Sequence, residues 1–383
     1  MIKKLGTAIS EYSVRNKLDE DIPVYSVTNE QGFCTGYFSK DVASKDRTTY
    51  KIVPYGYFAY NPSRINVGSI DWQHSEERVI VSPLYVVFGV DESVDKRYLL
   101  HYLKSDIARM LIKNYASGSV RDNLKLSTLM EFPFNFRSLE EQKKIADVLD
   151  KIDNLIGVQK QRMDYFDRLV KSRFIELFGN YINEGGKPLS ELATITGGLT
   201  KNSKRNTFNL KMPYLRVANV FFNRLDLNEI LEIGVREDEI GKTLLQTGDL
   251  LFVEGNGSIE QIGRVALWDG SISPILHQNH LIKARFHKKT ILPEFALFYF
   301  MSQEGRQQII SKSVSTSGLN TLSVNKICSL ILPMPPIELQ KQFAAFVAQT
   351  DKSKYYSQKF LTLCRLAVNT YEQEWMKCQT LNF

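Results

Sequence analysis

A long internal duplication constrains the fold of this chain more than any other feature of its sequence. Residues 119–134 and 139–145 resemble residues 318–333 and 337–343, and the two copies superpose at an offset of 198 residues. The matched pairs are Leu124 with Leu322, Leu126 with Val324, Leu129 with Ile327, Glu140 with Glu338, Gln142 with Gln340 and Lys143 with Lys341. A repeat of this length indicates two similar supersecondary units, so any fold must account for both copies.

Each copy is followed by a heptad pattern that predicts a long helix. Apolar side chains recur at alternating four- and three-residue steps, which is the spacing of a coiled-coil seam. The first seam consists of Ile145, Leu149, Ile152, Ile156, Met163, Phe166, Val170 and Leu177, with Gln159 and Arg173 at interrupted positions. The second consists of Phe343, Val347, Thr350, Lys354, Ser357, Leu361, Cys364, Val368, Tyr371 and Trp375. Each helix would contain about 35–40 residues and extend roughly 55–60 Å. Two unrelated amphipathic helices on separate cores are the alternative, but they leave the shared offset unexplained.

Ahead of each long helix the sequence predicts a globular domain of the α+β class. Short β-prone runs alternate with turn residues, for example at 24–28 and 85–88 in the first half and at 250–253 and 281–286 in the second. The expected organisation is a first globular domain at residues 1–136, a central long helix at 137–179, a second globular domain at 180–336 and a distal long helix at 337–383. Residues 183–188 are expected to form a linker after the central helix, because they combine turn residues with no apolar run.

Charge and cysteine usage narrow the class of partner. The formal net charge is +7 and the pI about 9.0, which suits a polyanionic partner. The excess is +1 in residues 1–136, +1 in 137–179, +3 in 180–336 and +2 in 337–383, so no segment is a basic tail. Cys34, Cys328, Cys364 and Cys378 show no CxxC spacing, which argues for a reducing compartment and against a zinc site. No signal peptide or membrane-spanning run is recognisable, so we expect a cytoplasmic protein.

Motifs of the enzymes that act on DNA or nucleotides are incomplete. The Asn-Pro-Ser-Arg sequence at residues 61–64 lacks the second proline and the aromatic residue with which DNA amino-methyltransferases hold the target amine. The Gly-Lys-Thr sequence at 241–243 lacks a glycine at the distance that a phosphate-binding loop requires. His277 and His280 have no carboxylate or cysteine partner in the sequence and predict a polar loop, with contact to a base as the alternative. We therefore expect no catalytic, cofactor-binding or metal-binding residues in this chain.

The chain resembles the specificity subunit family of type I restriction–modification enzymes over essentially its whole length. The paired stretches EEQKKIADVLDKIDNLI and IELQKQFAAFVAQTDKS are similar to the central and distal conserved helices of that family. The stretches PVYSVTNEQGF and KDVASKDRTTYKIVPYGYFAYNPSRINVGSI, and MPYLRVANV with GDLLFVEGNGSIEQIGRVAL, are similar to its target-recognition domains.

This resemblance implies a non-catalytic, DNA-reading subunit. Each target-recognition domain would bind one half of a bipartite site in double-stranded DNA, and the long helices would pair as an antiparallel coiled coil that spaces the half-sites. Methyltransferase subunits carrying S-adenosylmethionine would dock on the helices, and motor-nuclease subunits would bring ATP and Mg. Two readers related by a pseudo-two-fold repeat suit a divided site, because half-site spacing mirrors protein symmetry.

Two features depart from the family pattern. Leu339 stands where family members commonly carry Glu, and we expect little consequence at an exposed helix start. The lead-in before Val24 is short, so the first domain is expected to lack an opening strand.

The expected DNA contacts are polar and basic side chains on loops, because these match the hydrogen-bonding patterns of base edges and phosphates. In the first domain they are Asn61, Ser63, Arg64 and Asn66 after the β-prone run 57–60, followed by Arg121, Asn123 and Lys125 ahead of the long helix. In the second domain they are Lys201, Asn202, Lys204, Arg205, Asn256, Ser258 and Gln261. A structural turn built on Pro62 and a solvated loop at 200–205 are the alternatives, and residues 288–289 are interpreted as a solvated turn.

The function that follows is that of a DNA-specificity subunit. A helical scaffold that assembles partners without reading DNA is the alternative, and only salt-sensitive, sequence-dependent DNA binding separates the two. A self-contained enzyme such as a nuclease is disfavoured by the incomplete motifs.

Overall fold

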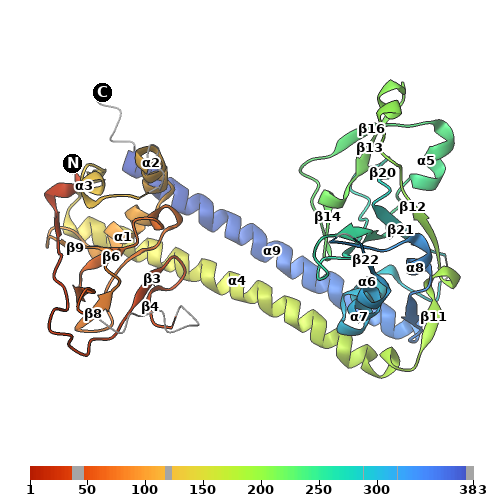
Figure 1. Ribbon diagram of the computed structural model, residues 1–383, viewed down its shortest axis with the longest axis horizontal. Coiled ribbons are helices and arrows are strands. Elements are labelled where there is room, and N and C mark those ends of the chain that lie inside the picture. The colour runs from red at the N-terminus through yellow and green to blue at the C-terminus, as the bar shows by residue number, and fades with distance from the viewer. Residues whose placement is uncertain (37–46, 117–122, 288, 317, 377–383) are drawn as a thin grey trace. The chain divides into compact units, whose positions relative to one another are not determined.

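The computed structural model describes residues 1–36, 47–116, 123–287, 289–316 and 318–376, which form two compact units (Figure 1). The first unit comprises Met1–Arg162 and Ser357–Phe383, and the second comprises Met163–Tyr356. Helices α4 (Leu139–Ile182) and α9 (Ile337–Met376) contribute residues to both units. The architecture is α+β, as the sequence predicts.

A four-stranded antiparallel sheet forms the centre of the first unit. Its strand order is β2 (Ile9–Glu11), β9 (Val86–Val90), β6 (Phe58–Tyr60) and β7 (Ile70–Trp72). Phe58 and Phe88 are fully buried and stack with ring centroids 5.2 Å apart. Two further strand pairs flank this sheet, β3 (Ser26–Thr28) with β4 (Gly32–Cys34) and β5 (Lys51–Pro54) with β8 (Arg78–Val81).

The second unit repeats this central sheet and adds more strands. Its order is β12 (Ala193–Gly197), β21 (Leu281–Phe286), β17 (Leu250–Val253) and β19 (Val265–Leu267). The additions are the sheet β16 (Leu231–Gly234), β13 (Lys211–Leu215) and β20 (Leu276–His277), the hairpin β14 (Val220–Phe221) with β15 (Arg224–Leu225), and the sheet β18 (Gly255–Asn256), β23 (Leu319–Thr321) and β22 (Val314–Thr316).

Three short helices precede each long helix in the same order. In the first unit they are α1 (Lys96–Lys104), α2 (Asp106–Ala116) and α3 (Leu126–Met130), and in the second α6 (Pro293–Met301), α7 (Gln303–Lys312) and α8 (Val324–Cys328). The second unit also contains α5 (Glu237–Thr243). This helix includes the Gly-Lys-Thr sequence, which therefore forms no loop.

Two expectations about chain segments are wrong. The first domain does have opening strands, because β1 (Ile2–Lys4) pairs with β10 (Pro133–Asn135) and β2 precedes Val24 as well. Residues 183–188 are not simply a linker, because β11 (Gly186–Pro188) pairs with β24 (Ile331–Pro333). In both cases a three-residue strand is too short to show a period, and its partner lies far along the chain.

A fully buried glutamine near the first turn of each long helix joins the start of that helix to the rest of a unit, α4 to the first unit and α9 to the second. The Gln142 side chain accepts a hydrogen bond from Asp95 N at 2.9 Å and donates to Ser93 O and Arg137 O, both at 2.9 Å. The position just before this glutamine differs between the copies, with Glu141 in the first and Leu339 in the second. Leu339 is not on an exposed surface as expected but packs against the core of the second unit.

Gln340 makes the equivalent contacts in the second unit. It accepts from Leu292 N at 2.8 Å and donates to Thr290 O at 3.0 Å and Pro335 O at 2.8 Å. A buried amide that is fully hydrogen-bonded fixes the start of a helix against the loop before it, because any shift would leave polar groups unpaired.

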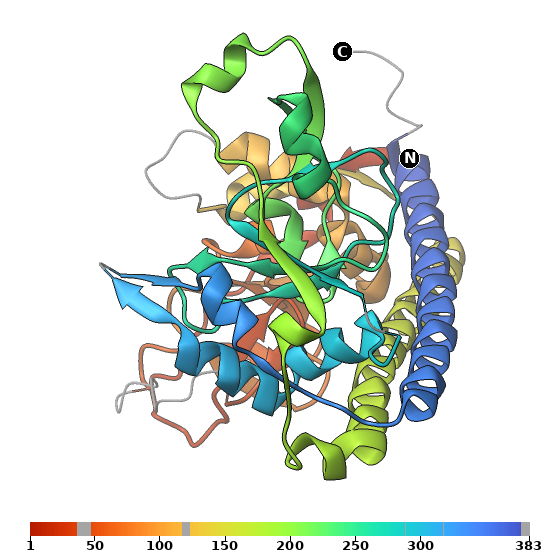
Figure 2. The ribbon, with the colours of Figure 1, turned by 90° about the vertical axis from the view of Figure 1, so that its right-hand side faces the viewer.

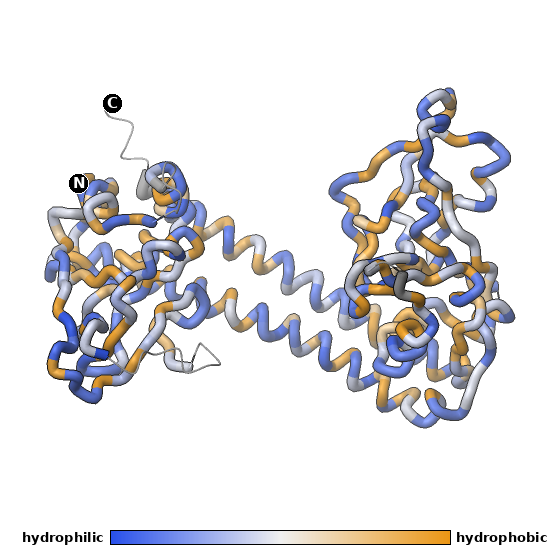
Figure 3. The backbone as a smooth tube through the Cα atoms, viewed as in Figure 1, coloured by the Kyte–Doolittle hydropathy of each residue, from blue (hydrophilic) through white to orange (hydrophobic). Residues whose placement is uncertain are grey.

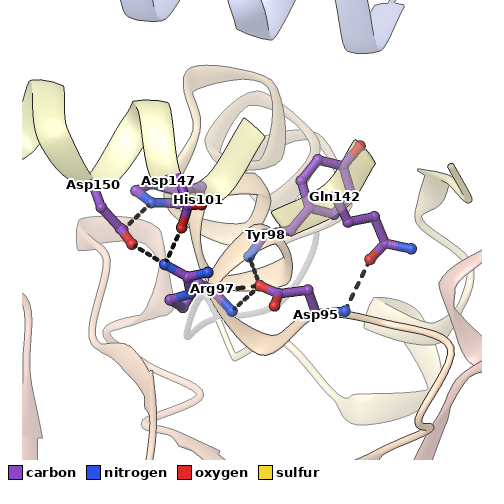
Figure 4. Close-up of polar contacts among 7 residues, drawn as sticks. All are labelled: Asp95, Arg97, Tyr98, His101, Gln142, Asp147 and Asp150. Carbon is purple, nitrogen blue, oxygen red and sulfur yellow. Dashed lines mark hydrogen bonds and ion pairs between the residues drawn. The ribbon is translucent and has the colours of Figure 1, made fainter. Parts of the chain in front are cut away.

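The two units hold the long helices by different side chains. In the first, Arg97 of α1 donates to Asp147 at 2.7 Å and Asp150 at 2.8 Å, and His101 lies 2.7 Å from Asp150 (Figure 4). In the second, Phe174 and Phe178 of α4 and Phe343 of α9 form an aromatic cluster with α6. Along α4 and α9, apolar residues recur among polar ones (Figure 3).

Candidate nucleic-acid interface

The turn after β6, an inner strand of the central sheet, presents polar side chains at the carboxyl end of that strand. Asn61 Oδ1 accepts hydrogen bonds from Ser63 N at 3.1 Å and Ser63 Oγ at 2.9 Å, which is an Asx turn. Arg64 and Asn66 are exposed on the short 3₁₀ turn that follows. The Asn61 side chain thus shapes the turn, whereas the structural alternative had based the turn on Pro62, and the turn exposes Arg64 and Asn66.

A second predicted segment lies against this turn. Leu124 N donates to Pro62 O at 3.2 Å, and the hydroxyl of Tyr60 donates to Leu124 O at 3.0 Å. Leu124 is buried, whereas its neighbours Asn123 and Lys125 are exposed. The structure therefore brings two sequence-distant groups of candidates into one region.

The tip of the β3–β4 hairpin joins them, and the sequence analysis missed it. Gly68 ends the 3₁₀ turn with a φ of 90°, and a Cβ atom there would lie 2.4 Å from Asn29 Oδ1. Asn29 is an exposed amide of the type that reads base edges. Its stretch is similar to a target-recognition domain, but no periodicity could have placed its tip beside Gly68.

The second unit also has an Asx turn, which begins at Asn256, at the end of β18 and three residues beyond β17. Asn256 Oδ1 accepts from Ser258 N at 2.9 Å, the same two-residue Asx geometry as in the first unit. Leu322 N donates to Glu254 O at 2.7 Å, as Leu124 N does to Pro62 O. Figure 2, in which this unit faces the viewer, shows the β22–β23 hairpin projecting from the edge of the unit beside β18. Ser258 is exposed and Gln261 is half-buried.

The basic loop after β12 is connected to this turn by a third segment, which forms hydrogen bonds with both. Lys201, Asn202 and Lys204 are all exposed. Asn279 N donates to Leu199 O at 3.0 Å, and Glu254 N donates to His280 O at 2.9 Å. Residues 278–280 thus connect the 200–205 loop to the turn that carries Asn256. The half-buried amides of Gln278 and Asn279 are further candidates that the sequence analysis did not select.

Of the remaining predicted contacts, one is not described by the structure and one is buried. Arg121 lies outside the described residues. Arg205 is buried, and its guanidinium donates to Glu239 at 2.9 and 3.1 Å, Thr200 O at 2.5 Å and Gly234 O at 3.0 Å. The Arg205 guanidinium also lowers the pKa of Glu239. A buried and fully paired arginine holds its loop in place, so we correct its expected role from DNA contact to structural anchor.

His277 belongs to the core. It is fully buried, and Nδ1 lies 2.8 Å from Thr243 O at the carboxyl end of α5. Lys283 and Arg285 donate to neighbouring carbonyls of the same helix end, at 2.9–3.0 Å. Burial lowers the pKa of His277 to about 4 and that of Lys283 to about 8. His280 is exposed and lies 2.8 Å from Glu254. The pair is thus a buried histidine and a loop histidine with separate roles.

Acidification is expected to destabilise the second unit through His277. Because its pKa is lowered from 6.5 to about 4, the unfolded chain binds the proton first as pH falls. Stability is therefore complete above pH 6.5 and falls by about 3 kcal/mol between pH 6.5 and 4. Urea unfolding at several pH values measures this decrease in the free energy of unfolding. We expect His280→Gln to show the same decrease as the wild type and His277→Gln to show a smaller one. Parallel stability–pH curves for wild type and His277→Gln would contradict the assignment.

The described residues contain no group of three His, Cys, Asp or Glu side chains arranged to hold a metal ion. Within the same residues, no helix has the length and apolar character needed to cross a membrane.

A family model described as "Type I restriction modification DNA specificity domain" matches residues 3–164 and 186–359. The chain belongs to this family. The two matches fall on the two copies of the repeat, so both halves carry the family's domain. Membership also accounts for the resemblance of the paired helix segments.

Individual relatives agree with this family. The chain is 26% identical over 311 residues to the EcoKI specificity subunit of Escherichia coli, covering 75% of this chain and 65% of that protein. It is 23% identical over 276 residues to the StySPI specificity subunit of Salmonella potsdam, covering 68% of this chain and 59% of that protein. The alignments thus span less than two thirds of these relatives' own lengths.

Solved structures show the same fold. A chain from a study of type I restriction–modification complex assembly and conformational transition superposes with a TM-score of 0.57 at 14% identity, covering 97% of this chain and 95% of that chain. The S subunit from M. genitalium superposes with a TM-score of 0.55 at 14% identity, covering 97% and 94%. The two-unit α+β architecture is therefore that of the family.

Proposed function

We propose that this chain is the non-catalytic specificity subunit of a type I restriction–modification complex in the cytoplasm. Residues 1–136 and 180–336 act as target-recognition domains, and each reads one half of a bipartite site in double-stranded DNA. The observation that carries this proposal is the repetition of one framework. In both units an Asx turn follows an inner strand of the central sheet, directly or within three residues, and carries exposed polar side chains. The segment before the third short helix donates a backbone hydrogen bond to the same region.

Within each domain the side chains divide into two roles. Arg64, Asn66 and Asn123 in the first, and Asn202, Ser258 and Gln261 in the second, supply the donors and acceptors that base edges require. Lys125, Lys201 and Lys204 are exposed cations at the margins of these turns and contact phosphates. Asn61, Ser63 and Asn256 mainly hold the turns in shape.

The helical segments 137–179 and 337–383 act as the spacer between the half-sites. An antiparallel coiled coil is supported inside each unit. In the second, Phe343 near the start of α9 contacts Phe174 near the end of α4, and Lys354 pairs with Asp167. In the first, the late residue Val368 of α9 packs on the core that includes the early residues of α4.

Methyltransferase subunits are proposed to dock on these helices, bringing S-adenosylmethionine, and motor-nuclease subunits bring ATP and Mg. Val158 of α4 and Tyr356 of α9 are equivalent positions of the repeat, as are Tyr165 and Leu363. All four side chains are large, apolar and exposed. Exposed apolar side chains repeated at equivalent positions favour two copies of one protein partner.

Methylation mapping tests this function. In cells that contain this chain and a matching methyltransferase subunit, we expect methylation at a motif with two short defined halves and a fixed gap, lost on deletion of the gene. Arg64→Ala is expected to reduce methylation through one half only and Ser258→Ala through the other, because each unit reads its own half-site. Arg236→Ala, which removes an exposed arginine that pairs with Asp238 and is not a proposed DNA contact, is the matched control. Purified chain and partner that bind DNA without sequence preference would favour the helical scaffold instead.

A further inference from the structure

Three arginine side chains of the second unit lie on two phenylalanine rings at the β14–β15 hairpin. The Arg224 guanidinium is 4.4 Å from the centre of the Phe221 ring, and that of Arg264 is 5.2 Å from the same ring. Arg306, from α7, lies 5.0 Å from the centre of the Phe222 ring. Cation–π contacts of this kind limit the orientations of a guanidinium and leave its outer edge available for hydrogen bonds.

The arginines of this cluster have no direct ion-pair partner within the described residues, although Glu304 and Asp351 line the same pocket as Arg224. Among the residues that the structure describes, no carboxylate forms an ion pair with Arg224, Arg264 or Arg306. Arg306 donates to backbone oxygens, and Arg264 Nε is buried with no hydrogen-bond partner in the described part of the chain. Burial lowers the pKa of both side chains. Arg224 is exposed, so an incoming anion can reach it.

The cluster is joined to the turn that carries Asn256. Asn223, at the hairpin tip with a φ of 47°, donates its N–H to Val265 O at 2.8 Å. Arg306 Nη1 donates to Ile262 O at 2.7 Å and Nη2 to Glu260 O at 3.1 Å. These bonds hold the hairpin and α7 against residues 260–265, which include the proposed reading residue Gln261.

The first unit neutralises the corresponding arginine. Arg109 follows the helix-capping Ser105 by four residues, as Arg306 follows the helix-capping Ser302. Arg109 is 3.4 Å from Asp106, an acid that the second unit replaces by Gln303. The unpaired charge is therefore a property of the second unit and not of the repeated framework.

We propose that the Arg224 side chain binds a phosphodiester group of the DNA, and that the charges of Arg264 and Arg306 beside it add to the attraction. The inference rests on the proposed DNA-reading function, to which it adds a sequence-independent contact. A guanidinium held by a ring matches two phosphate oxygens at once, and such contacts position a protein without reading sequence. The second domain thereby contributes more salt-dependent affinity than the first.

Salt-dependent binding to a duplex of arbitrary sequence, about 30 base pairs long, tests this contact in the full chain. The slope of log K against log salt is negative, and losing one phosphate contact makes it shallower by about 0.9. The same loss weakens binding roughly eightfold near 0.1 M salt. We expect both effects in Arg224→Gln and a partial loss in Arg224→Lys, which keeps the charge but not the planar fork. Arg236→Gln removes an exposed arginine that pairs with Asp238 at 3.2 Å, and it should leave the slope unchanged.

The outcomes separate the two proposals. If the wild-type chain and its partner subunit bind no duplex, the DNA-reading function fails. If they bind and Arg224→Gln keeps the wild-type slope, only the phosphate contact is overturned. Calorimetric titration with inorganic phosphate distinguishes a free anion from DNA. Saturable phosphate binding that depends on Arg224, with an unchanged slope for duplex, would assign the cluster to a small anion.

Discussion

Replacing Phe343 by alanine is expected to lower the free energy of unfolding of the second unit by about 3–5 kcal/mol. The Phe343 ring is fully buried, with its centroid 5.4 Å from that of Phe174, 5.5 Å from Phe178 and 5.1 Å from Phe298. These neighbours come from α4 and α6, so the cavity would open where three helices meet. Rigid helices cannot collapse into such a space, and the cost therefore lies toward the upper end of that range.

Urea unfolding followed by near-ultraviolet circular dichroism measures this loss. Tyr355→Ala is the matched control, because it removes a large aromatic side chain from the same helix and the same unit at a position where 63% of the residue is exposed. We expect less than about 1 kcal/mol for that variant. Equal losses for the two variants would show that the aromatic cluster does not anchor α9.

Replacing Gln142 by leucine is expected to cost about 3 kcal/mol in the first unit. The change keeps the approximate volume but removes three hydrogen bonds, and it leaves Asp95 N, Ser93 O and Arg137 O without their partner. An unsatisfied buried polar group costs about 1–3 kcal/mol, and the backbone relieves part of this by shifting toward water. Such a shift would also loosen α1, which Asp95 caps through the N–H groups of Arg97 and Tyr98.

Lys143→Leu is the control, since its side chain is exposed one residue further along the same helix. Amide hydrogen exchange reports the predicted local effect, with faster exchange at Asp95 and in the first turn of α1 for Gln142→Leu only. Gln340→Leu should act in the same way on Leu292 and α6, because the two glutamines make equivalent contacts. Unchanged exchange in both variants would remove the glutamines from the helix anchor.

The internal repeat predicted the arrangement of elements but not how each unit holds its helices. The glutamines are identical in the two copies, and their roles are the same. Arg97 forms ion pairs and His101 a hydrogen bond with α4, whereas the aromatic side chains of α6 take over that role in the second unit. The two copies of the repeat keep the same residue where a side chain must hydrogen-bond to the backbone. They differ where a short helix packs on a long one, because either an ion pair or an aromatic contact can hold the two helices together there.

The candidate site was only partly predictable. Residue type and loop position identified Arg64, Asn66, Lys201 and Lys204, which are exposed. They did not show that Arg205 is buried and paired with Glu239, because its local sequence is the same as that expected around an exposed arginine that is available to bind DNA. Asn29 and Arg224 were missed for the opposite reason, since each owes its position to a short hairpin whose neighbours lie far along the chain.

The amino-acid sequence by itself determined the duplication, the two long amphipathic helices and the α+β class, because apolar periodicity and repeated polar positions are local properties that survive without coordinates. The tertiary structure decided which polar side chains gather around the Asx turn of each unit and which basic side chains keep an unpaired charge. Burial and pairing depend on contacts between residues that are distant in sequence. The distinction between a structural arginine such as Arg205 and an available one such as Arg224 therefore exists only in the folded chain.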